Sequence, residues 1–317
     1  MRHLFVMDPL DRLNLAGDST YVTMVECSRR DHQVWWCTPD RLFGKDGHGF
    51  AHANPVVSRM EAPHFRQGSV EVVAFDDVDV IWMRKDPPFD MGYVFTTYLL
   101  DLAPRTTLVV NAPAGLKLFN EKMWAMRFPS VHPSTLVSNN VAELRAHIQA
   151  LPGRAVIKPW DGNGGRGVLV TQAGDRNLGS MLELLTSEGR EYILCQPFLD
   201  GVERGDKRVV LFDGEPVGAM LRVPGKADFR GNMHVGATVE PCEIDASDRR
   251  ICDLLGPELK RWGQVFVGID VIDGHLTEIN VTSPTGLQEM NRLYGVTLQS
   301  DLVDCVEARR ARQLEAQ

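Results

Sequence analysis

The segment Asp161-Gly162-Asn163-Gly164-Gly165-Arg166-Gly167 is the most glycine-dense part of the chain. Its GxGxxG spacing marks a dinucleotide site only where a helix follows the loop and holds phosphate on its N-terminus. Short β-type runs lie on both sides here, at 155–157 and 168–170, and no Gly-Lys-Ser/Thr of a Walker A loop is present. The pattern predicts a glycine flap between two strands that covers phosphates with backbone N–H groups. An ordinary glycine-rich turn is the alternative.

Two lysines are placed to reach phosphates beneath such a flap. Lys158 precedes Pro159 at the end of the strand that enters the loop, and Lys122 lies on the preceding segment. An ammonium group there would act on phosphate oxygens as a point charge. Each lysine taken alone is more often a surface residue.

Acidic and amide side chains interrupt two apolar runs near the C-terminal end, at Asp270, Glu278 and Asn280. Carboxylates inside apolar strands are costly unless they are paired or bound to metal. Glu278 and Asn280 are two residues apart, so they share one face of a strand. Three oxygen donors suit a hard cation such as Mg²⁺, which also takes oxygens from substrate phosphates. The pattern predicts a cation site, with a half-exposed polar hairpin as the alternative.

Side-chain parity along this hairpin makes a geometric prediction. Directly opposite residues of an antiparallel pair share a face. A two-residue Asp273-Gly274 turn would pair Ile272 with His275 and send Asp270 to the face away from Glu278. A three-residue loop, 272–274, would place Val271 opposite His275 and gather the acids on one face. We therefore expect the three-residue loop, with Gly274 in the left-handed conformation.

Three arginines follow the glycine-rich segment: Arg208, Arg222 and Arg230. The stretch 224–238 is long, polar and glycine-bearing, as in a mobile loop that closes over a site. An arginine on such a loop can stabilise a phosphoryl group or an oxyanion. Each arginine taken alone is more often a surface residue.

The elements that must position these groups change along the chain. Alternating strands (3–7, 33–37, 70–75, 78–83, 107–111) and helices (18–30, 90–102) predict an α/β layer over the first 115 or so residues. The basic cluster at 84–88 lies just past the carboxyl end of strand 78–83, where open α/β sheets bind ligands. Helices are expected at 114–126, after Asn140 and at 247–262, with a β-rich pattern from 155 and a hairpin at Asp213-Gly214.

Composition restricts the classes of function. The 317 residues predict two or three domains, and 44% apolar with 24% charged residues is typical of a globular protein. The net charge of −8, without a basic block, excludes a binder of duplex nucleic acid or of a membrane surface. Six scattered cysteines fit reduced thiols, and no apolar run is long enough for a signal peptide or a spanning helix. We expect a cytoplasmic protein.

Together these segments resemble the ATP-grasp superfamily and, within it, the bacterial glutathione synthetases. The resemblance covers most of the chain and rests on Val6-Met-Asp-Pro9, Met83-Arg-Lys-Asp-Pro-Pro-Phe-Asp90, Asn120-Glu-Lys122, the loop 158–165, Gly205-Asp-Lys-Arg208 and Leu276-Thr-Glu-Ile-Asn-Val-Thr-Ser-Pro-Thr285. The glycine loop is widely shared, whereas the segments 83–90 and 276–285 are specific to this family.

The resemblance implies an α/β fold of the α+β ATP-grasp type. An open α/β substrate domain (1–118) would precede a lid subdomain with the glycine loop (119–195) and a C-terminal subdomain with the metal site and the mobile loop (196–317). The last two would clamp ATP between them. The implied reaction is the ATP-dependent ligation of glycine to γ-glutamylcysteine through an acylphosphate, which gives glutathione, ADP and phosphate. Such enzymes use Mg²⁺, with Mn²⁺ as a second cation, and are often homotetramers.

The resemblance also implies roles for single residues. Nucleotide phosphates would be bound by Lys122, Lys158, Gly162, Asn163, Gly164 and Gly165, and adenine by backbone groups of Gln196, Pro197, Phe198 and Leu199. Mg²⁺ would be held by Asp270, Glu278 and Asn280. The transferred phosphoryl group and the tetrahedral intermediate would be stabilised by Arg208, Arg222 and Arg230, and the substrate carboxylates by Arg84, Ser283 and Thr285. Pro197 has no N–H, so the backbone donor to the adenine ring would be Leu199.

Two alternatives stay open within this superfamily. One is a carboxylate–amine ligase that acts on a different peptide or amino-acid pair. The other is a nucleotide-binding relative without ligase turnover. A structural or interaction protein would leave the buried acids unexplained.

Overall fold

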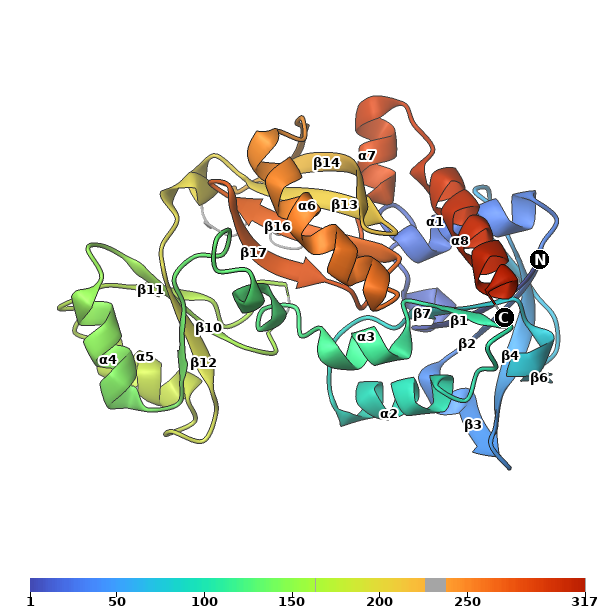
Figure 1. Cartoon of the computed structure of the whole chain (residues 1–317), viewed down its shortest axis with the longest axis horizontal. Helices are drawn as coiled ribbons and strands as arrows, with labels where there is room; N and C mark the ends of the chain where they lie inside the picture. The colour runs from blue at the N-terminus through green and yellow to red at the C-terminus, as the bar shows by residue number, and fades with distance from the viewer. Residues whose placement is uncertain (163, 226–237, 317) are drawn as a thin grey trace.

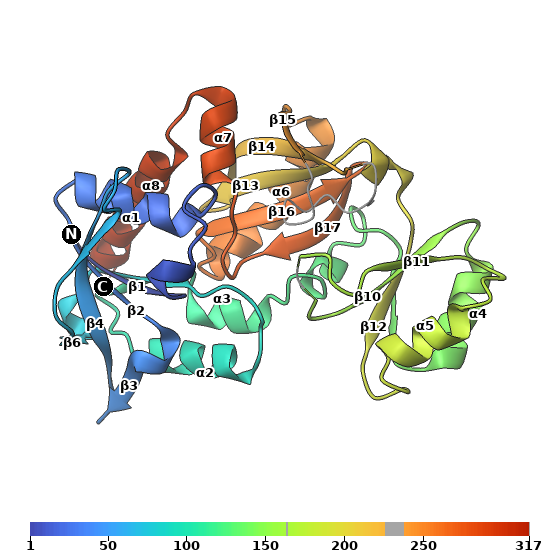
Figure 2. The ribbon, with the colours of Figure 1, turned by 180° about the vertical axis from the view of Figure 1, so that it is seen from behind.

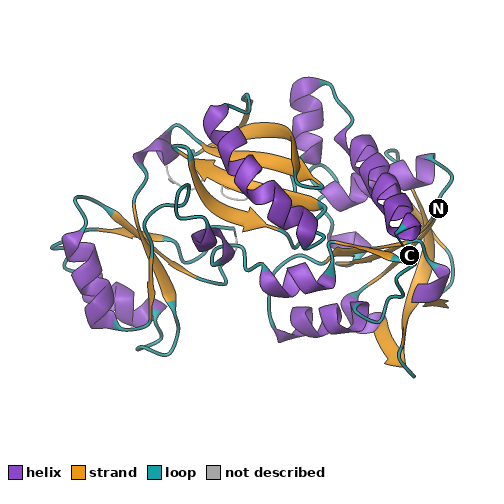
Figure 3. Cartoon of the chain, viewed as in Figure 1, coloured by secondary structure: helices purple, strands orange, loops and turns teal. Residues whose placement is uncertain are grey.

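The computed structural model describes residues 1–162, 164–225 and 238–316. Three sheets follow one another across the molecule (Figure 1), with the N-terminal sheet at one end and the sheet of β9–β12 at the other. The sheet of β13–β17 lies between them, and the two chain termini lie close together at the N-terminal end. Figure 3 shows the same arrangement by type of element.

The N-terminal sheet has the order β3-β4-β2-β1-β7-β8, and β5 and β6 pair with β4. Its strands are β1 (Arg2–Met7), β2 (Gln33–Cys37), β3 (Leu42–Lys45), β4 (His48–Ser58), β5 (Phe65–Gln67), β6 (Glu71–Ala74), β7 (Val80–Arg84) and β8 (Leu108–Val110). Strands β2, β1, β7 and β8 are parallel. Every residue of β1 from His3 onward is buried, because helices cover both faces of this part of the sheet.

Those helices are α1 (Ser19–Arg29) and α8 (Leu298–Glu315) on one face, and α2 (Met91–Leu100) and α3 (Pro113–Leu118) on the other (Figures 1 and 2). Helix α1 begins where the sequence predicts, since the Asp18 side chain accepts the Tyr21 N–H at 2.7 Å. The predicted helix 114–126 is wrong as one element. Helix α3 ends at Leu118, and Asn120 accepts the N–H groups of Lys122 and Met123 before a 3₁₀ turn, Trp124–Arg127.

The second sheet is antiparallel, in the order β11-β10-β12-β9. It comprises β9 (Leu136–Ser138), β10 (Ala155–Pro159), β11 (Leu169–Thr171) and β12 (Ile193–Pro197), with α4 (Val141–Ala150) and α5 (Leu178–Leu185) packed on it (Figure 1). These helices and strands share a small core of their own. Strands β10 and β11 flank the glycine segment, which confirms the predicted strand–loop–strand arrangement.

The third sheet is antiparallel too, in the order β15-β14-β13-β16-β17. Its elements are β13 (Asp206–Phe212), β14 (Glu215–Val223), β15 (Thr238–Pro241), β16 (Phe266–Ile272) and β17 (His275–Asn280). Helix α6 (Ala246–Arg261) covers one face of this sheet with Ile251, Leu255 and Leu259 buried (Figure 1). The predicted Asp213-Gly214 hairpin is confirmed, because Phe212 pairs with Glu215 around it.

The C-terminal part of the chain returns to the N-terminal sheet. Helix α7 (Leu287–Tyr294) leads into α8, which lies beside α1 (Figure 1). Arg30, the residue that follows α1, forms ion pairs with Asp304 and Glu307 of α8. Arg310 of α8 forms an ion pair with Asp79. The proposed boundary at 118 falls between the first and second sheets, whereas the one at 195 falls inside β12, and α8 lies beside α1 at the N-terminal end. No helix within the described residues is long and apolar enough to span a membrane.

Candidate active site

The β16–β17 hairpin differs from the three-residue loop that parity predicted. Ile272 pairs with His275, and Asp273 and Gly274 form a two-residue turn with φ angles of 49° and 71°. Asp270 nevertheless lies directly opposite Glu278, because the register shifts by one residue between Asp270 and Val271. Thr277 is the extra residue of this β-bulge, and its hydroxyl donates to the Asp270 carbonyl at 3.0 Å. The prediction was wrong because the parity count assumes an uninterrupted ladder.

Arg208, Asp270 and Glu278 form one row across β13, β16 and β17, each directly opposite the next. The Arg208 guanidinium donates hydrogen bonds to both carboxylate oxygens of Asp270, at 2.6 Å to Oδ1 and 3.2 Å to Oδ2. Arg222 adds a second contact to Asp270 at 3.0 Å. Burial favours the neutral acid, but the two arginines hold the pKa of Asp270 below its usual range. Asp270 is therefore an ionised carboxylate in a buried, cationic setting.

The three predicted cation ligands lie in one cavity. Asp270, Glu278 and Asn280 all line it, and the Asn280 amide donates to Asp270 Oδ2 at 3.3 Å. That orientation leaves the Asn280 carbonyl oxygen and the Glu278 carboxylate as further oxygen donors. Each carboxylate oxygen has more than one lone pair, so an arginine contact does not exhaust Asp270 as a ligand. This all-oxygen donor set fits a hard divalent cation.

A first cavity, of about 820 Å³ and partly open to solvent, lies between the second and third sheets. Its lining includes Val156, Lys158, Gly164, Gly165, Val168, Gln196, Pro197, Phe198, Leu199, Asp206 and Glu278. Lys158, Gly164 and Gly165 of the predicted phosphate group thus face one space with the predicted adenine segment, whereas Lys122 and Gly162 line a smaller neighbouring cavity. The Phe198 N–H donates to the Arg154 carbonyl at 2.9 Å, which leaves Leu199 as the next backbone donor along the segment.

The two lysines lie where a nucleotide's phosphates would meet the glycine loop. Lys158 lines the first cavity, and burial lowers its pKa. Lys122 donates to the Gly162 carbonyl, and its ammonium nitrogen is 3.5 Å from a Glu278 oxygen. Lys122 therefore connects the loop to the acid row. Asn163 lies outside the described residues.

A second cavity, of about 970 Å³, adjoins the first. Its lining includes Arg208, Arg222, Ser283 and Thr285, so four predicted catalytic and substrate residues face one space. The two cavities share Gly164, Asp270 and Glu278. Arg230 and most of the predicted mobile loop 224–238 lie outside the described residues.

Arg84 is the last residue of β7 and contacts the segment Ser283–Thr285. Its Nε donates to Thr20 Oγ1 at 2.9 Å, and a terminal nitrogen donates to the Pro284 carbonyl at 2.8 Å. The guanidinium also stacks over Phe266, 4.7 Å from the ring centre. These contacts support the segment that carries Ser283 and Thr285, and a direct contact of Arg84 with substrate stays a prediction.

Sequence analysis missed two acids of this site, Asp206 and Glu121. Asp206 lies opposite Arg222 and binds it at 2.6 Å, and burial raises the pKa of Asp206. The signal was present, because Asp206 and Arg208 share a strand face in the way Glu278 and Asn280 do. Glu121 accepts the Thr282 hydroxyl at 2.9 Å, and burial together with Glu278 raises its pKa to about 7. Glu121 lies in neither a strand nor a helix, so no periodic pattern marked it in the sequence.

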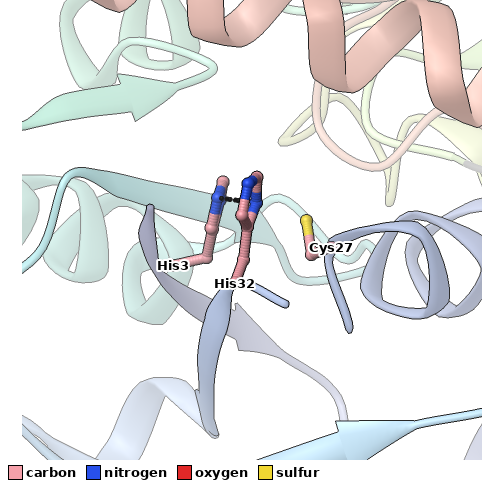
Figure 4. A group of neighbouring side chains, drawn as sticks. All are labelled: His3, Cys27 and His32. Carbon is pink, nitrogen blue, oxygen red and sulfur yellow. Dashed lines mark hydrogen bonds between the residues drawn. The ribbon is translucent and has the colours of Figure 1, made fainter. Parts of the chain in front are cut away.

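A second group of possible metal ligands comprises His3, Cys27 and His32 (Figure 4). None of the three lines either cavity. Burial is the main reason why the pKa of His3 falls to about 3, so this ring is neutral. Trp82 Nε1–H donates to His3 Nδ1 at 3.0 Å, which places the single proton of His3 on Nε2, 3.0 Å from His32 Nδ1. That nitrogen offers a proton rather than a lone pair. Trp82, His3 and His32 therefore form a hydrogen-bond chain within the N-terminal sheet.

Comparison with known proteins identifies the family of the chain. The family model for the N-terminal domain of prokaryotic glutathione synthetase matches residues 1–117, and the one for its ATP-grasp domain matches residues 121–295. Glutathione synthetase of Thermosynechococcus vestitus is 42% identical over 93% of this chain and 96% of its own length. That of Agrobacterium fabrum is 42% identical over 97% of this chain and 96% of its own length.

Solved structures show the same fold at low identity. D-cycloserine synthetase has a TM-score of 0.67 at 14% identity, over 98% of this chain and 99% of its own. D-alanine–D-alanine ligase from Bacillus anthracis has a TM-score of 0.60 at 14% identity, over 100% of this chain and 99% of its own. The architecture is thus that of ATP-grasp proteins. With both family models covering most of its length, the chain belongs to the prokaryotic glutathione synthetases.

Proposed function

We propose that this chain joins glycine to γ-glutamylcysteine with ATP, giving glutathione, ADP and phosphate. ATP transfers its γ-phosphoryl group to the cysteinyl carboxylate. The glycine amine then attacks the resulting acylphosphate and displaces phosphate. Transfer of this kind depends on positioning and on neutralising charge more than on a covalent nucleophile in the protein.

One observation supports this function above the others: the two cavities meet at Gly164, Asp270 and Glu278. The first cavity has the features of a nucleotide site, with Lys158 and the glycine loop at one end and the 196–199 segment at the other. The second is lined by arginines and hydroxyl side chains that suit carboxylate substrates. A γ-phosphate at the junction would face the substrate carboxylate directly.

Mg²⁺ is the cation we assign to Asp270, Glu278 and Asn280, with Mn²⁺ as a substitute. The cation would bridge phosphate oxygens and neutralise charge on the transferred group. Arg208 and Arg222 line the substrate side of the junction and would stabilise the phosphoryl group and the tetrahedral oxyanion. Arg230 is proposed for the same role on sequence grounds alone.

The remaining roles rest on the two cavities and on the sequence motifs. Lys122, Lys158, Gly162, Asn163, Gly164 and Gly165 would bind the phosphates, and Gln196, Pro197, Phe198 and Leu199 the adenine ring. Ser283 and Thr285, supported by Arg84, would bind substrate carboxylates. A ligase for another peptide or amino-acid pair is the second candidate, since low-identity neighbours of this fold include D-alanine–D-alanine ligase.

The test is phosphate release by purified protein with ATP, Mg²⁺ and a panel of acceptor pairs. We expect release only when γ-glutamylcysteine and glycine are both present, with glutathione formed in equal amount. Release with a different pair would favour the second candidate. Phosphate release without any acceptor, or nucleotide binding without turnover, would contradict ligation.

We also propose a cytoplasmic homotetramer. The six cysteines are unpaired in the structure, as in a reducing compartment. Helix α2 exposes Met91, Phe95 and Tyr98 by 75, 62 and 53%, and their i, i+4, i+7 spacing forms one apolar stripe that a neighbouring subunit could cover. Light scattering on the purified protein measures the assembly, and a monomer at micromolar concentration would contradict it.

A further inference from the structure

Two acidic side chains of the substrate cavity, Glu121 and Asp86, have no role in the ligation described above. Asp86 is exposed to solvent, whereas Glu121 is half-buried and is the one that a ligand would pair with away from water. Glu121 lines the second cavity together with the arginines, and it also lines a smaller neighbouring cavity beneath Phe119 and Trp160. Glu121, Pro87 and Thr282 are common to both linings, so they form the wall between the two spaces. Glu121 thus borders the chamber in which the acylphosphate would be attacked.

No cation in the described part of the chain forms an ion pair with this carboxylate, although Lys122 and Arg208 lie near enough to act on its charge. Glu121 Oε1 accepts the Thr282 hydroxyl at 2.9 Å. Within the described residues, no Lys, Arg or His nitrogen lies within the 4.0 Å of an ion pair with Glu121, and Lys122 next to it pairs with Glu278 instead. A half-buried carboxylate in this setting gains most from a cationic ligand.

The substrates supply such a cation. Glycine enters as a zwitterion, and its carboxylate and the dipeptide carboxylates match the arginine and hydroxyl groups of the cavity. The phosphates match the lysines and the glycine loop. These basic and hydroxyl groups offer no negative charge to the ammonium group of the acceptor. We infer that Glu121 binds the ammonium group of the acceptor amino acid and thereby orients its nitrogen toward the acylphosphate; this rests on the proposed ligation.

γ-Glutamylcysteine also carries an ammonium group, but at the end remote from the reacting cysteinyl carboxylate. Glu121 lies at the reacting end. Its carbonyl accepts the Ile279 N–H at 2.8 Å, next to Glu278, and Glu278 and Arg208 are among the charges that act on its carboxylate. The position therefore favours the acceptor's ammonium over that of the dipeptide.

The test compares Glu121→Gln with the wild type in steady-state kinetics. Glutamine keeps the size and the Thr282 hydrogen bond but loses the charge. We expect the KM for glycine to rise about 10- to 100-fold, the size of a lost hydrogen bond to a charged group, while the KM values for ATP and γ-glutamylcysteine stay within about twofold. Thr282→Val, which keeps the charge and removes the hydrogen bond, is the matched control and should raise the glycine KM much less.

Hydroxylamine separates this role from a structural one, because it attacks acylphosphates as a neutral amine. Glu121→Gln should form the hydroxamate of γ-glutamylcysteine at the wild-type rate while glycine ligation is impaired. A parallel loss of both would overturn the inference, as would weaker binding of γ-glutamylcysteine alone in calorimetry. If the wild-type protein forms no hydroxamate, the proposed ligation fails first, so the two failures are distinguishable.

Discussion

Asp270 lies directly opposite Glu278 across β16 and β17, although the two-residue turn between the strands would by itself put them on opposite faces. The single unpaired residue Thr277 restores the alignment. In an unbulged ladder of the same residues, Asp270 would pair with Thr277, and the row Arg208–Asp270–Glu278 would be interrupted at its last member. The cation site therefore depends on a β-bulge as much as on the ligands.

Inserting an alanine between Thr277 and Glu278 should separate folding from cation-dependent activity. The lengthened hairpin can keep its ladder, but Glu278 then lies opposite Ile269 and points away from Asp270. We expect turnover to fall at least about 100-fold with a changed Mg²⁺ requirement, by analogy with losing a group that stabilises charge in the transition state. Thermal unfolding shows whether the fold is retained. Deletion of Thr277 is the control, because it removes the bulge and leaves Glu278 paired with Asp270. An insertion variant with normal Mg²⁺ dependence would show that this alignment is not needed.

Lys158 offers a test of the nucleotide site. Its side chain is buried and faces the first cavity, where burial lowers its pKa. Lys158→Met keeps the length of the side chain and removes the charge. ATP affinity should fall by about 10-fold or more, and the midpoint of thermal unfolding should stay the same or rise, because a buried charge costs stability. Unchanged ATP affinity with a lower midpoint would mean that Lys158 is structural.

The sequence predicted strands β1, β2, β6, β7 and β8, the glycine flap and many of the residues that line the two cavities, because apolar runs, caps and glycine density are local signals. It did not predict β3, β4 and β5 of the N-terminal sheet. It did not predict the bulge at Thr277, since a bulge depends on the partner strand. Asn120 ended the expected helix 114–126 through a side-chain hydrogen bond that competes with helical ones. Glu121 became visible only when two distant segments formed one cavity wall.

The buried His3 predicts a pH dependence of stability. Its pKa is about 3 in the fold and 6.5 in the unfolded chain, so the unfolded state binds the extra proton between these values. Stability should therefore decrease as pH falls below 6.5, by up to about 1.4 kcal/mol per pH unit from this group. Urea unfolding between pH 7 and about pH 5 measures the slope. His3→Gln should reduce the slope of stability against pH, whereas His52→Gln, at an exposed histidine, should leave it unchanged. Equal slopes in the wild type and both variants would contradict this assignment.

Arg230→Ala tests the loop that sequence analysis assigned to the transition state. Turnover should fall far more than ATP affinity, because the expected contact matters mainly after phosphoryl transfer begins. Single-turnover kinetics and nucleotide binding on the same variant provide the two values. Equal losses in both would assign Arg230 to nucleotide binding instead.

The most direct measurement of the central claim follows oxygen from the dipeptide. γ-Glutamylcysteine labelled with oxygen-18 in its cysteinyl carboxylate is incubated with ATP, Mg²⁺, glycine and the purified protein. An acylphosphate intermediate predicts that one labelled oxygen appears in the released phosphate and the other remains in the new amide of glutathione. Unlabelled phosphate, with both labelled oxygens still on the dipeptide, would contradict phosphoryl transfer to the carboxylate.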